Sequence, residues 1–287
     1  SCCPRLTAKG DRQHTAMTLY TIDSTHWEPY STEEPEGVPL VIRRQVLSPG
    51  LRNYRDVVAA LPLSYHQEPD RSYPVVYMQD GQNLFDPATS YAGDWRLSQT
   101  LAELSREGTE AIVIGIANTG KHRLDEYSPF QHPGRGGGAG DRYLAFIAET
   151  LKPMVDRCFR TRPARPETFI AGSSMGGLIS LYALYRYADV FGGGAVLSPS
   201  LWFANRAIFR YVEENANLAV GRLYLDIGLN EPESAIADVR RLRDLISERG
   251  SMSETEFAYV EDAAGRHNEA TWGIRVRQAL SFLLESE

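Results

Sequence analysis

The chain has 287 residues, of which 43% are hydrophobic and 23% charged, a balance close to that of an average globular protein with one large domain. Its formal net charge of −7 argues against a nucleic-acid-binding protein, which needs a basic face. No apolar run approaches the roughly 18 residues that a membrane span requires.

The first part of the chain, SCCPRLTAKGDRQHTAM, has neither the apolar core of a secretory signal nor any periodic pattern before Met17. We expect residues 1–30 to be a leader or extension, in part disordered, and residues 31–287 to form a single domain. The missing signal favours a cytoplasmic location. Secretion is the alternative if residues 1–17 are the remnant of a processed leader.

Two apolar segments, residues 38–47 and 54–62, flank the turn SPGLRN and predict an antiparallel hairpin. Beyond it, short apolar runs alternate with segments of helical periodicity, and Pro153 is expected to kink the second helix. The predicted strands are residues 73–79, 111–118, 168–172, 193–199, 221–228 and 255–261, and the predicted helices are residues 95–107, 141–159, 175–190, 234–250 and 269–286.

This alternation of strands and helices indicates an α/β fold. The central sheet is predicted to be mostly parallel, with about eight strands, an antiparallel start and helices on both faces. In such sheets ligands bind outside the carboxyl ends of the strands. Functional residues are therefore expected in the loops that directly follow the predicted strands.

The sequence offers no predicted metal or cofactor site. Its three cysteines give neither a disulfide framework nor the spacing of a zinc site, and Cys158 is expected to be a buried helix residue. The glycine-rich segment PGRGGGAG, residues 133–140, does not match the G-x-G-x-x-G pattern and does not follow a strand directly. It is interpreted as a flexible loop rather than a phosphate cradle.

The segment Gly172-Ser173-Ser174-Met175-Gly176 matches the pattern G-x-S-x-G. A predicted strand precedes it and a predicted helix follows at once, which is the setting of a nucleophile elbow. At such an elbow a serine takes a strained backbone conformation on a sharp turn, so its neighbours must be small. We therefore predict that Ser174 is a nucleophile; the alternative is a Gly/Ser turn that only starts the helix.

A serine hydroxyl needs a base, and in the nucleophile-elbow fold the chain order is serine, acid, histidine. Of six histidines, only His267 follows Ser174, in a loop after the last predicted strand. Glu231 is the first acid beyond the strand that ends at residue 228, and it is favoured as the acid. Asp226 lies within that strand, where its side chain is expected to point into a packed face. Glu233 is expected to begin the next helix.

An oxyanion hole needs two N–H donors aimed at the negative charge that develops during the reaction. The backbone of Met175, directly after the predicted nucleophile, is expected to supply one of them. The second is expected from Gln82 in the loop YMQDGQNLFD, which follows a predicted strand and in which Gly81 permits a tight turn.

Six segments in one order resemble the putative-esterase branch of the α/β-hydrolases, which includes siderophore, feruloyl and acetylxylan esterases, S-formylglutathione hydrolases and mycolyltransferases. These segments are YMQDGQNLFDP, GDWRL, GIANTGKHRLDEYSP, GSSMGGLISLYAL, GLNEPE and GRHNEATW. The resemblance implies one α/β-hydrolase catalytic domain over residues 31–287. Carried over residue by residue, it implies a nucleophile at Ser174, a base at His267, an acid at Glu231, an oxyanion residue at Gln82, and pocket-wall residues at Trp95, Arg123 and Tyr127.

Together these features predict a metal-free serine carboxylic-ester hydrolase that acts through an acyl-enzyme on a small-molecule or glycan-linked ester. For the pocket-wall positions the alternatives are core packing at Trp95 and a hydrogen-bonded loop around Arg123 and Tyr127. Two alternative functions stand beside hydrolysis: acyl transfer by the same residues, and a non-catalytic binding protein of the same fold. The acyl and alcohol parts of the substrate stay open.

Overall fold

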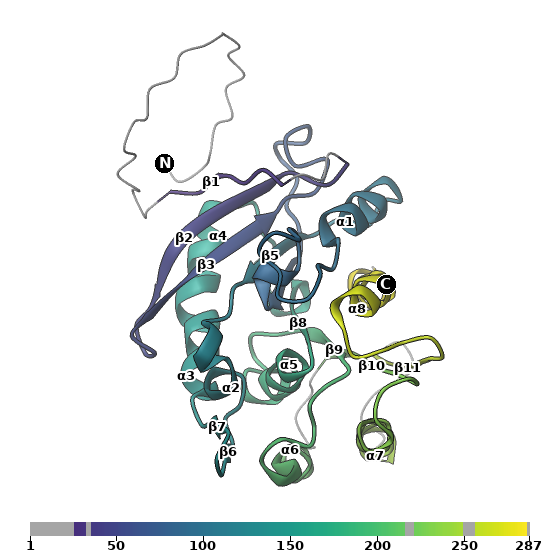
Figure 1. Cartoon of the computed structure of the whole chain (residues 1–287). Helices are drawn as coiled ribbons and strands as arrows, with labels where there is room; N and C mark the ends of the chain where they lie inside the picture. The colour runs from purple at the N-terminus through teal and green to yellow at the C-terminus, as the bar shows by residue number, and fades with distance from the viewer. Residues whose placement is uncertain (1–25, 33–35, 216–220, 249–255, 286–287) are drawn as a thin grey trace.

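The computed structural model describes residues 26–32, 36–215, 221–248 and 256–285, and the structural statements below concern these residues. Met17 and the helix end predicted at Gly250 lie outside them. A nine-stranded sheet runs through the molecule in the order β1-β2-β3-β5-β4-β8-β9-β10-β11 (Figure 1). The pairs from β1 to β3 and the pair β3–β5 are antiparallel, and all pairs from β5 to β11 are parallel.

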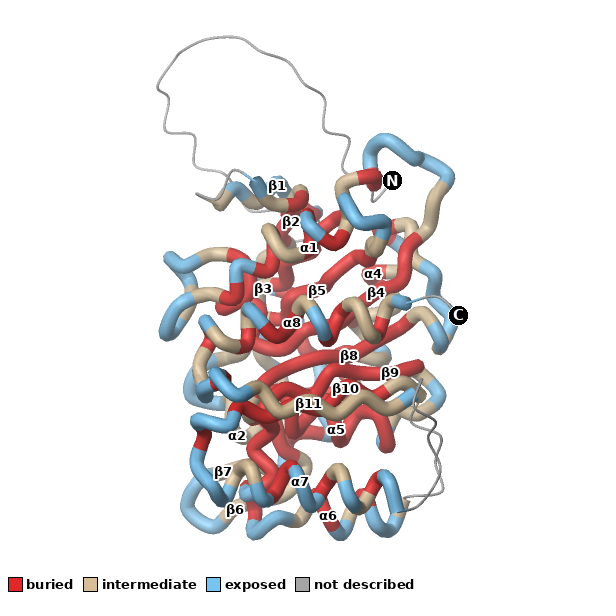
Figure 2. The backbone as a smooth tube through the Cα atoms, turned by 90° about the vertical axis from the view of Figure 1, so that its right-hand side faces the viewer, coloured by how far each residue is buried: buried red, intermediate tan, exposed pale blue. Residues whose placement is uncertain are grey.

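The central strands form where the sequence has short, continuous apolar runs. Strands β4 (Val75–Gln79), β5 (Ile112–Ile116) and β9 (Gly193–Leu197) are buried along their whole length, as expected for parallel strands covered by helices on both faces. Strand β11 at the sheet edge is half-buried (Figure 2). The remaining strands of the sheet are β1 (Glu28–Pro29), β2 (Leu40–Ser48), β3 (Asn53–Ala60), β8 (Thr168–Ser173), β10 (Arg222–Gly228) and β11 (Phe257–Asp262).

Helices cover both faces of the sheet, and each face has its own hydrophobic core. On one face α1 (Leu97–Arg106) packs against α8 (Glu269–Leu284), and apolar side chains of both helices share one cluster. The other face carries α3 (Gly140–Ala145), α4 (Lys152–Cys158), α5 (Met175–Arg186), α6 (Phe203–Glu214) and α7 (Glu233–Glu248). Within the part of the chain that the structure describes, no helix combines the length and the hydropathy of a membrane span.

The predicted α/β fold is confirmed, with differences in detail. The sheet has nine strands rather than about eight, because the two-residue strand β1 pairs with β2. Helix α6 was not predicted, although its buried residues Ala204, Ile208 and Val212 recur at helical spacing. At its start Ala204, Asn205 and Arg206 have left-handed φ values of 48°, 55° and 62°. The predicted helix 141–159 contains a π-helical stretch, Phe146–Leu151, just before Pro153, so the irregular geometry falls where proline cannot donate a backbone hydrogen bond.

The glycine-rich segment, predicted as a flexible loop, forms a small hairpin of its own. Strand β6 (Gln131–His132) pairs with β7 (Gly136–Gly137) in an antiparallel ladder. Gly134, Gly136 and Gly137 have φ values of 80°, 89° and 102°, a region of backbone conformation that residues other than glycine rarely adopt. The glycines therefore serve the turn of this hairpin.

Candidate active site

The predicted functional residues gather at one edge of the sheet. Ser174 directly follows β8, while Gln82, Glu231 and His267 follow β4, β10 and β11. These strands belong to the block β4-β8-β9-β10-β11, in which all pairs are parallel, so their carboxyl ends meet at the same edge. This is the position at which parallel α/β sheets bind ligands.

Ser174 occupies a sharp turn between β8 and α5. Its φ of 57° and ψ of −122° lie outside the regions that a serine normally adopts. The flanking glycines explain how the turn closes: a Cβ on Gly172 would lie 2.7 Å from the backbone of Gly176, and a Cβ on Gly176 would lie 2.9 Å from Gln79. The turn is held by two backbone hydrogen bonds, from Ser174 N to Leu197 O at 3.0 Å and from Ser200 N to Ser174 O at 2.9 Å.

A continuous chain of hydrogen bonds links three of the predicted residues. The Oγ atom of Ser174 lies 2.9 Å from Nε2 of His267. On the other side of the ring, Nδ1 of His267 lies 2.7 Å from Oε2 of Glu231. The Oγ atom of Ser200 lies 3.1 Å from that of Ser174. The imidazole also contacts the Trp272 ring edge-on, with 4.8 Å between ring centroids.

Glu231 is held as an ionised carboxylate. Burial of its side chain disfavours the charge, but hydrogen bonds from His267, Ser198 and the Gly228 amide outweigh this effect and hold the pKa of Glu231 below its usual value. The Gly228 amide nitrogen lies 3.1 Å from Oε1. Both carboxylate oxygens therefore have fixed donors.

The two predicted oxyanion residues lie at the starts of helical turns. Met175 is the first residue of α5, and Gln82 lies in the 3₁₀ turn Gly81–Asn83 that follows β4. The first amides of a helix have no acceptor within the helix and are free to bind an anion. Gly81 is required here because a Cβ would lie 2.5 Å from the backbone of Gly115 on β5.

A clamp around Asp80 fixes the turn that carries Gln82. Asp80 has left-handed angles, with φ of 55° and ψ of 46°. Arg123 binds its carboxylate with two hydrogen bonds of 2.8 Å, and Asn118 Nδ2 adds a third at 2.6 Å. The backbone N–H of Asn118 in turn donates a hydrogen bond to Oε1 of the Gln82 side chain, with an N–O distance of 3.1 Å. This network restrains the backbone on both sides of Gly81.

The serine and histidine open into a pocket of about 580 Å³. One wall is aromatic: the Trp95 and Trp272 rings lie 6.1 Å apart. Another wall is polar and includes Glu269, a largely buried residue. Burial raises the pKa of the Glu269 carboxyl above its usual value, and the nearby charge of Asp80 adds to the shift.

The three residues predicted for the pocket wall lie in different surroundings. Trp95 and Arg123 line the pocket, although the Arg123 guanidinium is bound to Asp80. Tyr127 is fully buried and does not line it; its hydroxyl accepts a hydrogen bond from the Asp80 amide at 3.0 Å. Arg123 and Tyr127 thus both contact the turn after β4.

Sequence reasoning missed the loop that follows β9. Ser198 and Ser200 in this loop contact Glu231 and Ser174. The rule that functional residues follow the strands would have found them, because the segment LSPS ends a predicted strand. Among the described residues, no group of three or more His, Cys, Asp and Glu side chains is arranged to hold a metal ion.

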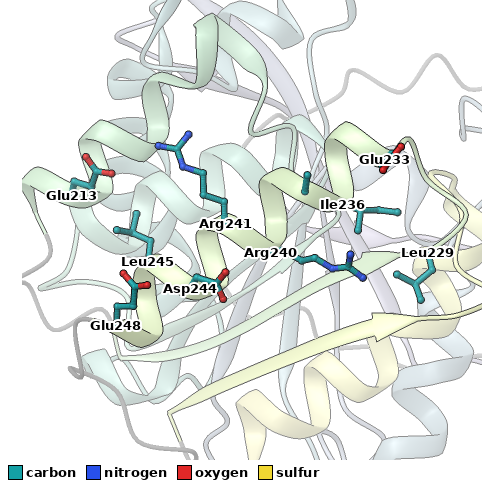
Figure 3. Close-up of a pocket in the computed structure, with 10 residues that line it drawn as sticks. Glu213, Leu229, Glu233, Ile236, Arg240, Arg241, Asp244, Leu245 and Glu248 are labelled. Carbon is teal, nitrogen blue, oxygen red and sulfur yellow. The ribbon is translucent and has the colours of Figure 1, made fainter.

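A larger hollow of about 810 Å³ lies along α7, and neither Ser174 nor His267 lines it (Figure 3). It is lined by charged side chains of α7, including Glu233, Arg240 and Arg241, and by Leu229. Glu233, the alternative acid considered above, therefore faces this hollow at the start of α7. The ion pair of Arg240 with Glu261 on β11 has a 2.8 Å contact.

The fold and the serine, histidine and carboxylate at the strand ends define an α/β-hydrolase-type protein. A family model described as "Putative esterase" matches residues 48–283. The chain belongs to this esterase family, and it is a carboxylic ester hydrolase.

Among characterised and uncharacterised relatives, an uncharacterised Bacillus subtilis protein, YbbA, is 26% identical over 72% of this chain and 84% of its own. A siderophore enterobactin esterase from Emericella nidulans is 28% identical over 64% of this chain and 65% of its own. Two solved structures share the fold: the BES protein from Bacillus cereus and the siderophore hydrolase EstA from Aspergillus nidulans. The BES protein has a TM-score of 0.69 and 20% sequence identity, and the match covers 98% of this chain and 100% of that protein. EstA has a TM-score of 0.67 and 21% sequence identity, and the match covers 90% of this chain and 98% of that protein.

Proposed function

We propose that this esterase uses Ser174 as nucleophile, His267 as general base and Glu231 as the acid that orients the histidine. The proposal is carried by the two hydrogen bonds that join these side chains, of 2.9 Å and 2.7 Å. Ser174 Oγ attacks the ester carbonyl carbon while Nε2 of His267 takes the hydroxyl proton. Glu231 keeps the other ring proton on Nδ1 and stabilises the imidazolium as it forms.

The negative charge that develops on the carbonyl oxygen is held by the N–H groups of Gln82 and Met175 in this proposal. When the tetrahedral intermediate collapses, the ester C–O bond breaks and the alcohol leaves with the proton from His267. The acyl group stays on Ser174. A water molecule then gives a proton to His267 and attacks the acyl carbon, which releases the acid and restores Ser174.

We infer that siderophore esters are the first substrate class to test. Fungal relatives of this chain are described as esterases of enterobactin and of triacetylfusarinine C. The pocket, with its aromatic wall at Trp95 and Trp272, suits an aromatic or extended acyl group. A panel of a catecholate trilactone, a hydroxamate siderophore ester, methyl ferulate, acetylated xylan and short nitrophenyl esters will define the class. Product analysis with an added alcohol separates hydrolysis from acyl transfer.

The nucleophile is tested by a pair of adjacent substitutions. Ser174→Ala should abolish hydrolysis of short nitrophenyl esters and labelling by a fluorophosphonate, because only the third position of the motif stands at the apex of the turn. Ser173→Ala should keep most of the activity and all of the labelling. Equal loss in both variants, or a label found on Ser173, would contradict the proposal.

A further inference from the structure

Behind Glu231 lies a buried polar cluster that the proposed chemistry does not use. Ser198 is the first residue after β9, Asp226 belongs to β10, and Trp272 and Arg275 come from α8. Ser198 is 1% exposed and Asp226 fully buried, and the Arg275 side chain is 4% exposed. A serine, an acid and a cation therefore meet in the interior next to the proposed catalytic carboxylate.

The hydroxyl of Ser198 has a defined direction. It accepts hydrogen bonds from Trp272 Nε1 at 3.2 Å and from Arg275 Nη2 at 2.9 Å. An indole N–H and a guanidinium can only donate, whereas a hydroxyl has two acceptor lone pairs and a single proton. With both lone pairs occupied, the Ser198 proton is directed to its third neighbour, Oε1 of Glu231.

Asp226 anchors the other side of this arrangement. Its Oδ1 atom accepts a hydrogen bond from Arg275 Nη1 at 2.9 Å and another from the Ser198 amide at 3.1 Å. Ser198 has a φ of 41°, which a residue with a side chain adopts only when its surroundings hold it there. The same buried carboxylate thus fixes both the backbone of Ser198 and the guanidinium that points at its hydroxyl.

We propose that Ser198 is a positioning residue for Glu231, with its hydroxyl proton aligned by Trp272, Arg275 and Asp226. The inference rests on the proposed function, in which Glu231 orients His267. Donation from Ser198 and the Gly228 amide occupies Oε1 and leaves Oε2 for the histidine. A glutamate has one more rotatable bond than an aspartate, so its carboxylate needs an additional restraint to keep one orientation.

The test uses two variants of the full chain that remove the hydroxyl. Ser198→Ala and Ser198→Gly should each lower kcat by about 10- to 100-fold, as expected for a lost hydrogen bond to a charged group, with KM changed less than about twofold. Ser198→Gly guards against misfolding, because glycine accepts the positive φ of this position. Ser180→Ala is the matched control: this serine is buried on α5, its hydroxyl has no partner among the described residues, and kcat should stay at the wild-type value.

A double-mutant cycle distinguishes positioning from general stability. In a Glu231→Gln background, replacing Ser198 should cause little further loss of kcat, because the residue acts through Glu231. The far-downfield proton resonance of His267 Nδ1–H should shift in the Ser198 variants and stay unchanged in Ser180→Ala. Wild-type kcat in folded Ser198→Gly, or the same fold loss in both backgrounds, would overturn the inference. If Glu231→Gln alone keeps wild-type kcat, the proposed function itself fails.

Discussion

Glu231 is the residue at which the proposed chemistry is tested most directly. Glu231→Gln keeps the shape of the side chain but removes the charge that fixes the histidine tautomer. We expect kcat to fall by about a thousandfold or more, by analogy with the acids of other serine hydrolases, in a nitrophenyl ester assay. Glu233→Gln, on the other side of the turn and facing the α7 hollow, should keep nearly full activity. A large loss in Glu233→Gln alone would move the acid to that position.

At the scale of single residues, the structure brings Ser174, His267 and Glu231 into contact. The sequence could single out these three because each follows a predicted strand and the expected order is serine, acid, histidine. Ser198 could not be assigned a partner, since its contact with Glu231 depends on β9 lying beside β10 in the sheet. Likewise Arg123 contacts Asp80 across 43 residues of sequence, and no local pattern records that pairing.

At the scale of elements, the 3₁₀ turn after β4 depends on α2 (Arg123–Glu126) for its conformation. Arg123→Met removes both hydrogen bonds to Asp80 and should loosen the turn that presents Gln82. If Arg123 acts by holding this turn, kcat should fall by about 10- to 100-fold with little change in KM, since the oxyanion is bound only in the transition state.

A pocket-wall role for Arg123 gives the opposite pattern in the same Michaelis–Menten measurement. If its guanidinium binds the substrate directly, KM rises and kcat changes less. Tyr127→Phe is the companion variant, because it removes only the hydroxyl that accepts from the Asp80 amide and has no surface in the pocket. It should follow Arg123→Met in direction, with a smaller effect on kcat.

The apolar runs of the sequence predicted the strands of the central sheet, but they did not predict the hairpin β6–β7 or the helix α6. Continuous apolar runs identified the central strands within one or two residues, for example β5 at Ile112–Ile116 within the predicted 111–118. The hairpin β6–β7 was missed because its strands are two residues each, and β7 consists of glycine alone, so periodicity carries no signal. Helix α6 was missed although its sequence has the apolar periodicity of a helix, with buried Ala204, Ile208 and Val212 spaced four residues apart.

For the whole molecule, Asp226 makes stability depend on pH. Burial, partly opposed by Arg275 and the Ser198 amide, raises the pKa of Asp226 from 3.8 to about 7. The folded state therefore holds this proton more tightly than the unfolded state, so the contribution of Asp226 to stability falls as the pH rises from about 4 to 7. In Asp226→Asn this decline should be absent. Urea unfolding at several pH values measures it, and identical pH dependence in both proteins would contradict the assignment.

The strained backbone of Ser174 sets stability against activity when the protein evolves. A serine held at a φ of 57° costs about 1–3 kcal/mol relative to a relaxed residue, and glycine at the same position avoids most of that strain. Ser174→Gly should therefore raise the free energy of unfolding and, under the proposed function, abolish ester hydrolysis. Under selection for thermal stability alone, this substitution would accumulate and give a more stable protein that lacks the proposed activity. Under the proposed function, only selection for ester hydrolysis retains the strained serine.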